Sequence, residues 1–351
     1  MSVEPPALIL VTGASGFVAA HIVAQLLDAG YRVRGTARGA KLALVRDHFK
    51  SNPSFEAIQI DDIATSDFHD ALIGVDAVLA VACPLSGKAD PNEQLKGAYD
   101  GTLNLLRQSI AAGVHKVVVT SSFATLLDPS FEAAYKGIVL NEQLYGKAFP
   151  EDILAGDRKP FYRYCGAKIL AEEAAWSFAE DHPELDLTTI NPPFMYGGYA
   201  IYPGNGPHAL GSTELIYQLI AGDGKSAFPP PSTVIYCNVR DAARAHLLAL
   251  RLPKLPQGSD VRGKRFLVAA PRHGARLWTE TVQWLAETRP ELRDRLPKLE
   301  DAPKLSGPLS TTDSTQAREK LGMHDYVGWD ATIDETVTAL LELEKKWKGQ
   351  T

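Results

Sequence analysis

The chain has 351 residues, of which 45% are hydrophobic and 22% are charged, so it can bury one large core or a core with a smaller lobe. Its net charge of -6 argues against a nucleic-acid surface, and no apolar run approaches the roughly 18 residues of a membrane span. Three scattered cysteines and nine scattered histidines show neither a disulfide framework nor metal-ligand spacing. We therefore predict a cytoplasmic protein without a metal, nucleic-acid or membrane partner, either a monomer or a homodimer.

Short apolar runs typical of buried strands recur along the chain. They cover residues 7–11, 31–37, 55–60, 77–82, 116–121 and 185–190. Between them, segments such as 21–30 and 102–113 have the periodicity of amphipathic helices and end at a glycine. Because parallel strands need crossover helices, this alternation predicts an α/β fold with a Rossmann-type, doubly wound parallel sheet.

The composition changes after Asn191, where Pro, Gly and Tyr become frequent, as in the irregular loops of a substrate lobe. Two strand-like pieces, 232–239 and 264–270, are expected to rejoin the sheet, with a helix at 240–250 between them. The predicted division is a Rossmann domain (1–195, with 234–271 returning to it), a smaller C-terminal substrate-binding lobe (196–233 and 272–330) and a C-terminal helix (331–351).

The first crossover, VTGASGFVAAHIV, places Gly13 and Gly16 directly after a strand and at the opening of a helix. A helix N-terminus attracts phosphate, and glycine lets the backbone approach it closely. A purely structural turn is the alternative, but the strand, turn and helix context favours dinucleotide binding. The predicted cofactor contacts in this loop are Gly13, Ser15, Gly16, Phe17 and Val18.

The end of the second strand predicts which dinucleotide is bound. NAD-binding folds place a carboxylate there for the ribose 2'-hydroxyl, whereas NADP requires its absence and a cation nearby. By spacing from Gly13 this position is Ala37, and Arg38 and Lys41 follow. Two solvated surface cations are the alternative interpretation. We predict NADP(H), with Arg38 and Lys41 meeting the 2'-phosphate.

The stretch FYRYCGAKILAEEAAW places Tyr164 four residues before Lys168, on one face of a predicted helix. Taken alone, this spacing is better explained by a half-buried aromatic beside a solvated lysine, because such spacings arise freely by chance. A tyrosine can nevertheless protonate the oxygen formed when hydride reaches a carbonyl, and a nearby ammonium is expected to lower its pKa. Ser121 and Ser122, at the end of the fifth strand, offer a hydroxyl to orient the carbonyl, and strand alternation lets only one of them face the site.

The motifs TGASGFVA, TSSFA and YCGAK, in this order and spacing, resemble the extended short-chain dehydrogenase/reductases. Together with GYRVRGTAR and INPPFMYG, they are similar to the NADPH-dependent methylglyoxal, aldehyde and ketone reductases, relatives of dihydroflavonol reductase and cinnamoyl-CoA reductase. The resemblance assigns the catalytic serine, tyrosine and lysine to Ser122, Tyr164 and Lys168. It also implies further cofactor contacts at Asp62, Ile63, Ala82, Pro192, Pro193 and Ser212. Two positions depart from the family pattern: Asp100, often Asn in relatives, and Asn238, usually acidic.

The predicted activity is reduction of an aldehyde or ketone to an alcohol by NADPH, with Tyr164 as proton donor. A dihydroflavonol or cinnamoyl-CoA type of reductase, a nucleotide-sugar epimerase or dehydratase, and a non-catalytic NADP-binding protein are the alternatives. The small-molecule carbonyl substrate is expected in a pocket lined by apolar side chains. The same side chains are equally well explained as part of the hydrophobic core. The residues predicted for this pocket are Leu85, Phe123, Phe161 and Phe194.

Overall fold

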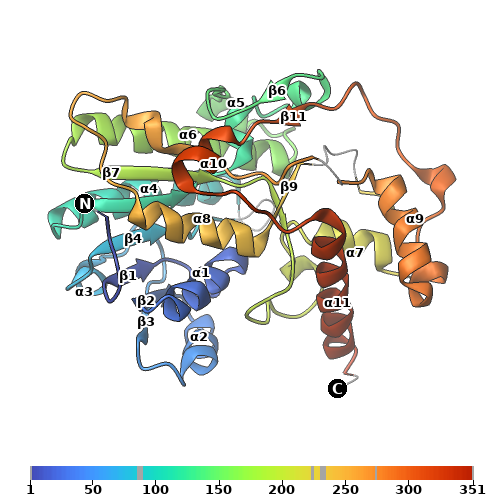
Figure 1. Cartoon of the computed structure of the whole chain (residues 1–351), viewed down its shortest axis with the longest axis horizontal. Helices are drawn as coiled ribbons and strands as arrows, with labels where there is room; N and C mark the ends of the chain where they lie inside the picture. Colours follow the sequence, from blue (N-terminus) through green and yellow to red (C-terminus); the bar gives the residue numbers. More distant parts are fainter. Residues whose placement is uncertain (1, 85–89, 223–224, 230–234, 273–274, 350–351) are drawn as a thin grey trace.

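The computed structural model describes residues 2–84, 90–222, 225–229, 235–272 and 275–349. A seven-stranded sheet whose neighbouring strands all run parallel forms its centre (Figure 1). In spatial order the strands are β10 (Arg265–Leu267), β7 (Asp186–Asn191), β5 (Lys116–Thr120), β4 (Ala77–Ala80), β1 (Leu8–Val11), β2 (Arg32–Ala37) and β3 (Phe55–Gln59). The order reverses between β4 and β1, which confirms the predicted doubly wound fold.

Helices cover both faces of this sheet, because successive side chains of a strand point to opposite sides. In β1, Ile9 and Val11 join one core and Leu8 and Leu10 the other. The helices on the first face are α1 (Phe17–Asp28), α2 (Lys41–Phe49), α8 (Val239–Arg251) and α10 (Thr315–Leu321). Those on the second face are α3 (His69–Leu72), α4 (Pro91–Ala111) and α6 (Pro160–Asp181).

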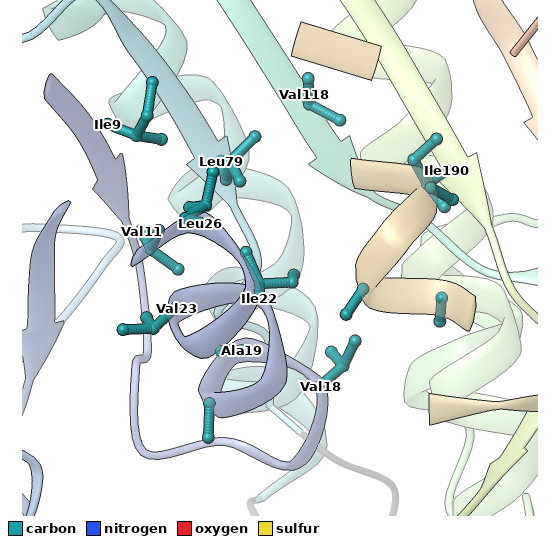
Figure 2. Close-up of a cluster of buried hydrophobic side chains, with 14 of the residues drawn as sticks. Ile9, Val11, Val18, Ala19, Ile22, Val23, Leu26, Leu79, Val118 and Ile190 are labelled. Atoms are coloured by element: carbon teal, nitrogen blue, oxygen red, sulfur yellow. The ribbon is translucent and has the colours of Figure 1, made fainter. Parts of the chain in front are cut away.

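The packing of α1 shows how the sequence specifies the first core. Its fully buried Ile22, Val23 and Leu26 lie over Ile9 and neighbouring strand residues (Figure 2). Burying a side chain of this size stabilises the fold by roughly 1.5 to 3 kcal/mol. These buried side chains therefore fix α1 on the sheet, with the N-terminus of the helix at the carboxyl edge of the strands.

A third core forms the smaller lobe, at the right of Figure 1. It joins α7 (Glu214–Ile220), α9 (Trp278–Thr288) and α11 (Trp329–Trp347). The ring centroids of Tyr236 and Trp329 lie 4.8 Å apart within it. The predicted C-terminal helix is thus α11, and its buried stripe packs into the lobe.

One strand prediction is wrong. Segment 264–270 does rejoin the sheet, as β10, but β9 (Tyr236–Asn238) pairs with β8 (Phe194–Tyr196) in a separate two-stranded sheet. Residues 232–234 lie outside the described part of the chain. Pro192 and Pro193 follow β7 and lack the N–H that a ladder needs, so pairing resumes beyond them in β8.

The remaining elements are short. They are β6 (Val139–Leu140), which pairs with β11 (Thr311–Thr312), the helix α5 (Pro150–Leu154), and the 3-10 helices η1 (Phe123–Leu126), η2 (Glu132–Tyr135), η3 (Pro207–Ala209), η4 (Val261–Lys264), η5 (Pro290–Arg295) and η6 (Leu299–Asp301). Among the described residues, no helix combines the length and the apolar character needed to cross a membrane.

Candidate active site

The glycine loop after β1 is fastened to the end of β4. The Thr12 hydroxyl accepts hydrogen bonds from the backbone N–H groups of Val81 and Ala82, both at 2.9 Å. Gly13 has a φ of +67°, and a Cβ added to it would lie 3.0 Å from the Ala82 Cβ. A glycine is therefore required at this position, and Gly13 and Ala82, both predicted as cofactor contacts, lie side by side.

The N-terminus of α1 is open to an anion. Gly16 is the N-cap and supplies no side-chain hydrogen bond, and the first turn contains no acidic residue. Unpaired N–H groups and the helix dipole at such an end favour a phosphate. Ser15 is half-buried, Phe17 contacts Tyr199 with 4.8 Å between ring centroids, and Val18 is buried in the core. The Val18 side chain is thus not available to a ligand, and a ligand could contact this residue only through its backbone.

The ends of β2 and β3 carry the residues predicted at the adenosine side. Ala37 is buried, whereas Arg38 and Lys41 are exposed. Hydrogen bonds from Ala64 N and the Thr65 hydroxyl lower the pKa of Asp62, and the charge of Arg38 lowers it further. Arg38 therefore lies near Asp62, on the side where the cofactor ribose is expected.

Ile63 lies next to Asp62 and packs on α4. A Cβ added to Gly101 of that helix would lie 2.8 Å from the Ile63 Cγ1. The glycine beside Asp100 therefore permits the close approach of α4. Asp100 itself is exposed.

The two serines at the end of β5 have different partners. The buried Ser121 hydroxyl donates to the Glu172 carboxylate. Ser122 is half-buried, accepts a 3.1 Å hydrogen bond from Ala124 N, and lies close enough to Tyr164 for its hydroxyl to lower the pKa of that tyrosine. Ser122 is therefore the serine that meets Tyr164.

The pKa of Tyr164 differs from its prediction. Burial raises it, the neighbouring Cys83 and Cys165 raise it further, and the hydrogen bond with Ser122 lowers it. Removing a phenolate from water costs more free energy than removing a phenol, so burial favours the protonated form. The prediction that Lys168 lowers the pKa of Tyr164 is thus wrong for this structure, because the pKa is raised. Tyr164 is protonated at neutral pH.

Lys168 lies one turn further along α6 and is buried, with 6% of its surface exposed. Its Nζ donates to the Thr120 carbonyl at 2.8 Å, which satisfies one of its three protons. A cavity of about 20 Å³ lies beside it, close to the volume of a single water site. Thr12, Ala82 and Thr120 are among its lining residues, so the glycine loop and α6 meet at this cavity.

His246 on α8 contacts the side-chain hydroxyl of the same threonine, Thr120. Its Nδ1 lies 2.7 Å from the Ala242 carbonyl and therefore donates, so Nε2 accepts from the Thr120 hydroxyl at 2.7 Å. Burial lowers the pKa of His246 to about 4. This fully buried residue was not predicted from the sequence, where a single histidine in an apolar helix carries no distinctive signal.

The residues predicted at the nicotinamide end follow β7. Pro192 and Pro193 are buried, and the Pro192 carbonyl accepts from Phe123 N at 2.9 Å. The half-buried Ser212 donates its hydroxyl to the Met195 carbonyl. The departure at Asn238 is structural, because this residue caps α8 through Arg240 N at 2.9 Å.

A connected group of phenylalanine rings begins beside Tyr164, at Phe161. Phe161 is 38% exposed, and its centroid lies 6.3 Å from Tyr164 and 6.2 Å from Phe194, with nearly parallel rings. Phe131, which was not predicted, contacts Phe161 at 5.2 Å. Phe123 is buried and reaches Phe131 at 5.9 Å, so it supports this group from within. Leu85 lies outside the described residues.

Several proteins of known activity resemble this chain along most of its length. Residues 9–262 match the NAD dependent epimerase/dehydratase family. A ketoreductase of Aspergillus niger is 32% identical over 95% of this chain and 97% of its own length. The chain belongs to this family. The NADPH-dependent methylglyoxal reductase of Saccharomyces cerevisiae is 29% identical over 96% of the chain and 98% of its own length.

A solved structure extends the likeness to the whole fold. Yeast methylglyoxal/isovaleraldehyde reductase Gre2, crystallised with NADPH, matches with a TM-score of 0.79 and 27% identity, covering 98% of this chain and 100% of that one. The predicted resemblance to the reductase group of the extended short-chain dehydrogenase/reductases is thereby confirmed.

The buried His246 predicts how stability depends on pH. A histidine in the unfolded chain titrates near 6.5 and this one near 4, so the unfolded state binds more protons in that window and stability falls as the pH falls through it. Between about pH 7.5 and about pH 5, the protein should lose about 2 kcal/mol more unfolding free energy than His246→Gln. Urea unfolding at both pH values measures this. The exposed His324→Gln is the control and should keep the parental loss; a His246→Gln variant with that same loss would contradict the prediction.

Proposed function

We propose that this protein is an NADPH-dependent reductase that converts aldehydes or ketones to alcohols. The observation that carries the proposal is that Ser122 at the end of β5 lies close enough to Tyr164 to lower its pKa, while the Lys168 ammonium is buried one turn further along α6 and donates to the Thr120 carbonyl. The named reductases that match along nearly the whole chain support the same activity.

The residues present fit the cofactor. Backbone N–H groups would bind the diphosphate. They lie at Gly13, which is packed against Ala82, and at the start of α1, which has no side-chain cap. The exposed Arg38 and Lys41 suit the 2'-phosphate, since Ala37 leaves no carboxylate to repel it. Asp62 and Ile63 would lie at the adenine, and Ala82, Pro192 and Pro193 at the nicotinamide. Ser212 is a less direct candidate, because its proton is already donated to Met195.

The reaction then assigns a task to each catalytic residue. Bound NADPH supplies the hydride for the carbonyl carbon. The Ser122 hydroxyl orients the carbonyl oxygen, and Tyr164 gives it a proton as negative charge develops there. The raised pKa of Tyr164 keeps that proton in place until the oxygen becomes the stronger base. Lys168 is held at the site by Thr120 and, in our proposal, contacts the nicotinamide ribose.

The other candidate functions are less well supported. A nucleotide-sugar epimerase or dehydratase holds NAD and binds a charged diphosphate on its substrate, whereas here Arg38 follows Ala37, and Phe161, itself stacked on Phe194, lies beside Tyr164. A non-catalytic NADP sensor has no need for a tyrosine hydrogen-bonded to a serine. A dihydroflavonol or cinnamoyl-CoA type of substrate is compatible with the aromatic group of Phe161, Phe194 and Phe131.

The division of labour within the chain is part of the proposal. We assign NADP(H) to residues 1–195 with 234–271, and the carbonyl substrate to the lobe of 196–233 and 272–330, which α11 completes. The three free thiols suit the cytoplasm, and a monomer or homodimer would suffice because all the named groups come from one chain.

Loss of the phenol hydroxyl tests the proton donor. Tyr164→Phe should still bind NADPH but reduce a small-carbonyl panel at least ~100-fold more slowly, because only the proton donor is removed. NADPH absorbance measures turnover and nicotinamide fluorescence measures binding. Tyr162→Phe, in the same helical turn, is the matched control and should keep parental rates. Near-parental turnover of Tyr164→Phe would remove Tyr164 from the mechanism.

Cofactor choice tests the loop after β2. Arg38→Ala should weaken NADPH at least about tenfold and leave NADH nearly unaffected, because a charge-assisted hydrogen bond is worth roughly 1.5 to 3 kcal/mol. Ala37→Asp should shift preference toward NADH by adding a ribose acceptor that repels phosphate.

The measurement is kcat/KM with each cofactor. The exposed Lys50→Ala, which removes one positive charge near the C-terminal end of α2, is the control for net charge. Equal use of NADH and NADPH by the parent protein, or equal losses with both cofactors in Arg38→Ala, would show that this loop does not recognise the phosphate.

A further inference from the structure

A buried ion pair lies beneath the catalytic serine. Glu172 stands on α6 one turn after Lys168, and Arg265 is the first residue of β10. Their side chains are only 4% and 1% exposed, and Arg265 Nε donates to Glu172 Oε1. Charges so deeply buried need several hydrogen-bond partners to offset their lost hydration.

The Glu172 carboxylate finds those partners at the end of β5. Its Oε2 accepts from the Ser121 hydroxyl and from Asn191 Nδ2 at 2.6 Å, and it lies 2.9 Å from the Thr125 hydroxyl. The donors come from both sides of Ser122 in the sequence and from the adjacent strand β7.

The Arg265 guanidinium also has hydrogen-bond partners at each of its nitrogens. One terminal nitrogen donates to the carbonyls of Glu142 and Leu144, at 2.6 and 2.7 Å, and the other donates to the Thr125 hydroxyl at 3.0 Å. The Tyr145 ring covers the guanidinium, with 4.1 Å from its carbon to the ring centroid. The forked geometry of Arg is used in full, which a lysine could not reproduce.

Two members of this network also reach the backbone of Ser122. The Thr125 hydroxyl lies 2.8 Å from the Ser122 carbonyl, and Asn191 Nδ2 lies 3.2 Å from it. Ser122 itself is extended, with φ of -159° and ψ of 149°, and lies near enough to Tyr164 to lower its pKa. The ion pair is therefore joined to the residues on both sides of the catalytic serine.

We propose that Glu172 and Arg265 are positioning residues that hold residues 121–125 so that the Ser122 hydroxyl meets Tyr164 and the substrate carbonyl. The inference rests on the reductase function proposed above. It assigns no chemistry to either charge; their effect on the rate passes through the placement of Ser122. Because Arg265 also binds the carbonyls of residues 142 and 144, the segment before α5 is fixed to the same unit.

The test is a double-mutant cycle with Ser122. Glu172→Gln keeps the shape but removes the charge that binds Arg265. It should lower kcat roughly 10- to 100-fold, because a small misplacement of a catalytic group has effects of this size. NADPH affinity should remain parental. In a Ser122→Ala background, the same Glu172→Gln change should lower kcat less than about twofold, since no hydroxyl is left to position.

Matched variants separate positioning from general loss of structure. Glu173→Gln, exposed and adjacent on the same helix, should leave kcat unchanged. Thr125→Val removes the hydroxyl between the ion pair and the Ser122 carbonyl and should lower kcat, whereas Thr125→Ser should restore it. If Glu172→Gln does not fold, the comparison of Thr125→Val with Thr125→Ser still tests the proposal.

The outcomes are distinct. Equal losses from Glu172→Gln, or from Thr125→Val if that is used, in the Ser122 and Ser122→Ala backgrounds would overturn the positioning role, because the effect would not pass through the serine. A parent protein that does not oxidise NADPH with any carbonyl of the panel would instead overturn the proposed function.

Discussion

Helix α6 buries two opposite charges, Lys168 and Glu172, one turn apart against the end of β5. Neither can lie in the interior without partners, and both find them there: the Thr120 carbonyl for Lys168, and the Ser121 hydroxyl with Arg265 for Glu172. This requirement fixes the rotation and the height of α6 on the sheet. Tyr164, one turn before Lys168, is thereby placed beside Ser122. The rest of the site depends on this position of α6 relative to β5.

The same edge of the sheet explains why the cofactor residues converge. The loop after β1 is held to the end of β4 by Thr12, and the close approach of Gly13 to Ala82 leaves no room for a side chain. Parallel strands present all their carboxyl ends together, so a loop, a helix N-terminus and a buried lysine from distant parts of the sequence meet at one place. The family name mentions NAD, but the end of β2 carries Ala37 and Arg38, which favour NADP(H).

Local patterns were sufficient to predict the sheet, the glycine turn and the Tyr164–Lys168 face, because each is encoded within a few residues. The pKa of Tyr164 was predicted in the wrong direction, since burial by neighbouring segments outweighs the nearby lysine. The pairing of β9 depends on where two prolines end β7, which periodicity does not reveal. The partnership of Glu172 with Arg265 was missed because it spans 93 positions and exists only once the sheet is assembled.

In the proposed reaction, hydride moves from NADPH to a carbonyl carbon at this site. The most direct test uses NADPH carrying deuterium at both C4 positions of the nicotinamide, with mass spectrometry and NMR of the alcohol formed from a reactive member of the carbonyl panel. We expect one deuterium per product molecule, bound to the carbinol carbon, when the reaction is run in ordinary water. Alcohol without deuterium at that carbon, or interconversion of isomers without net consumption of NADPH, would contradict the proposed reaction.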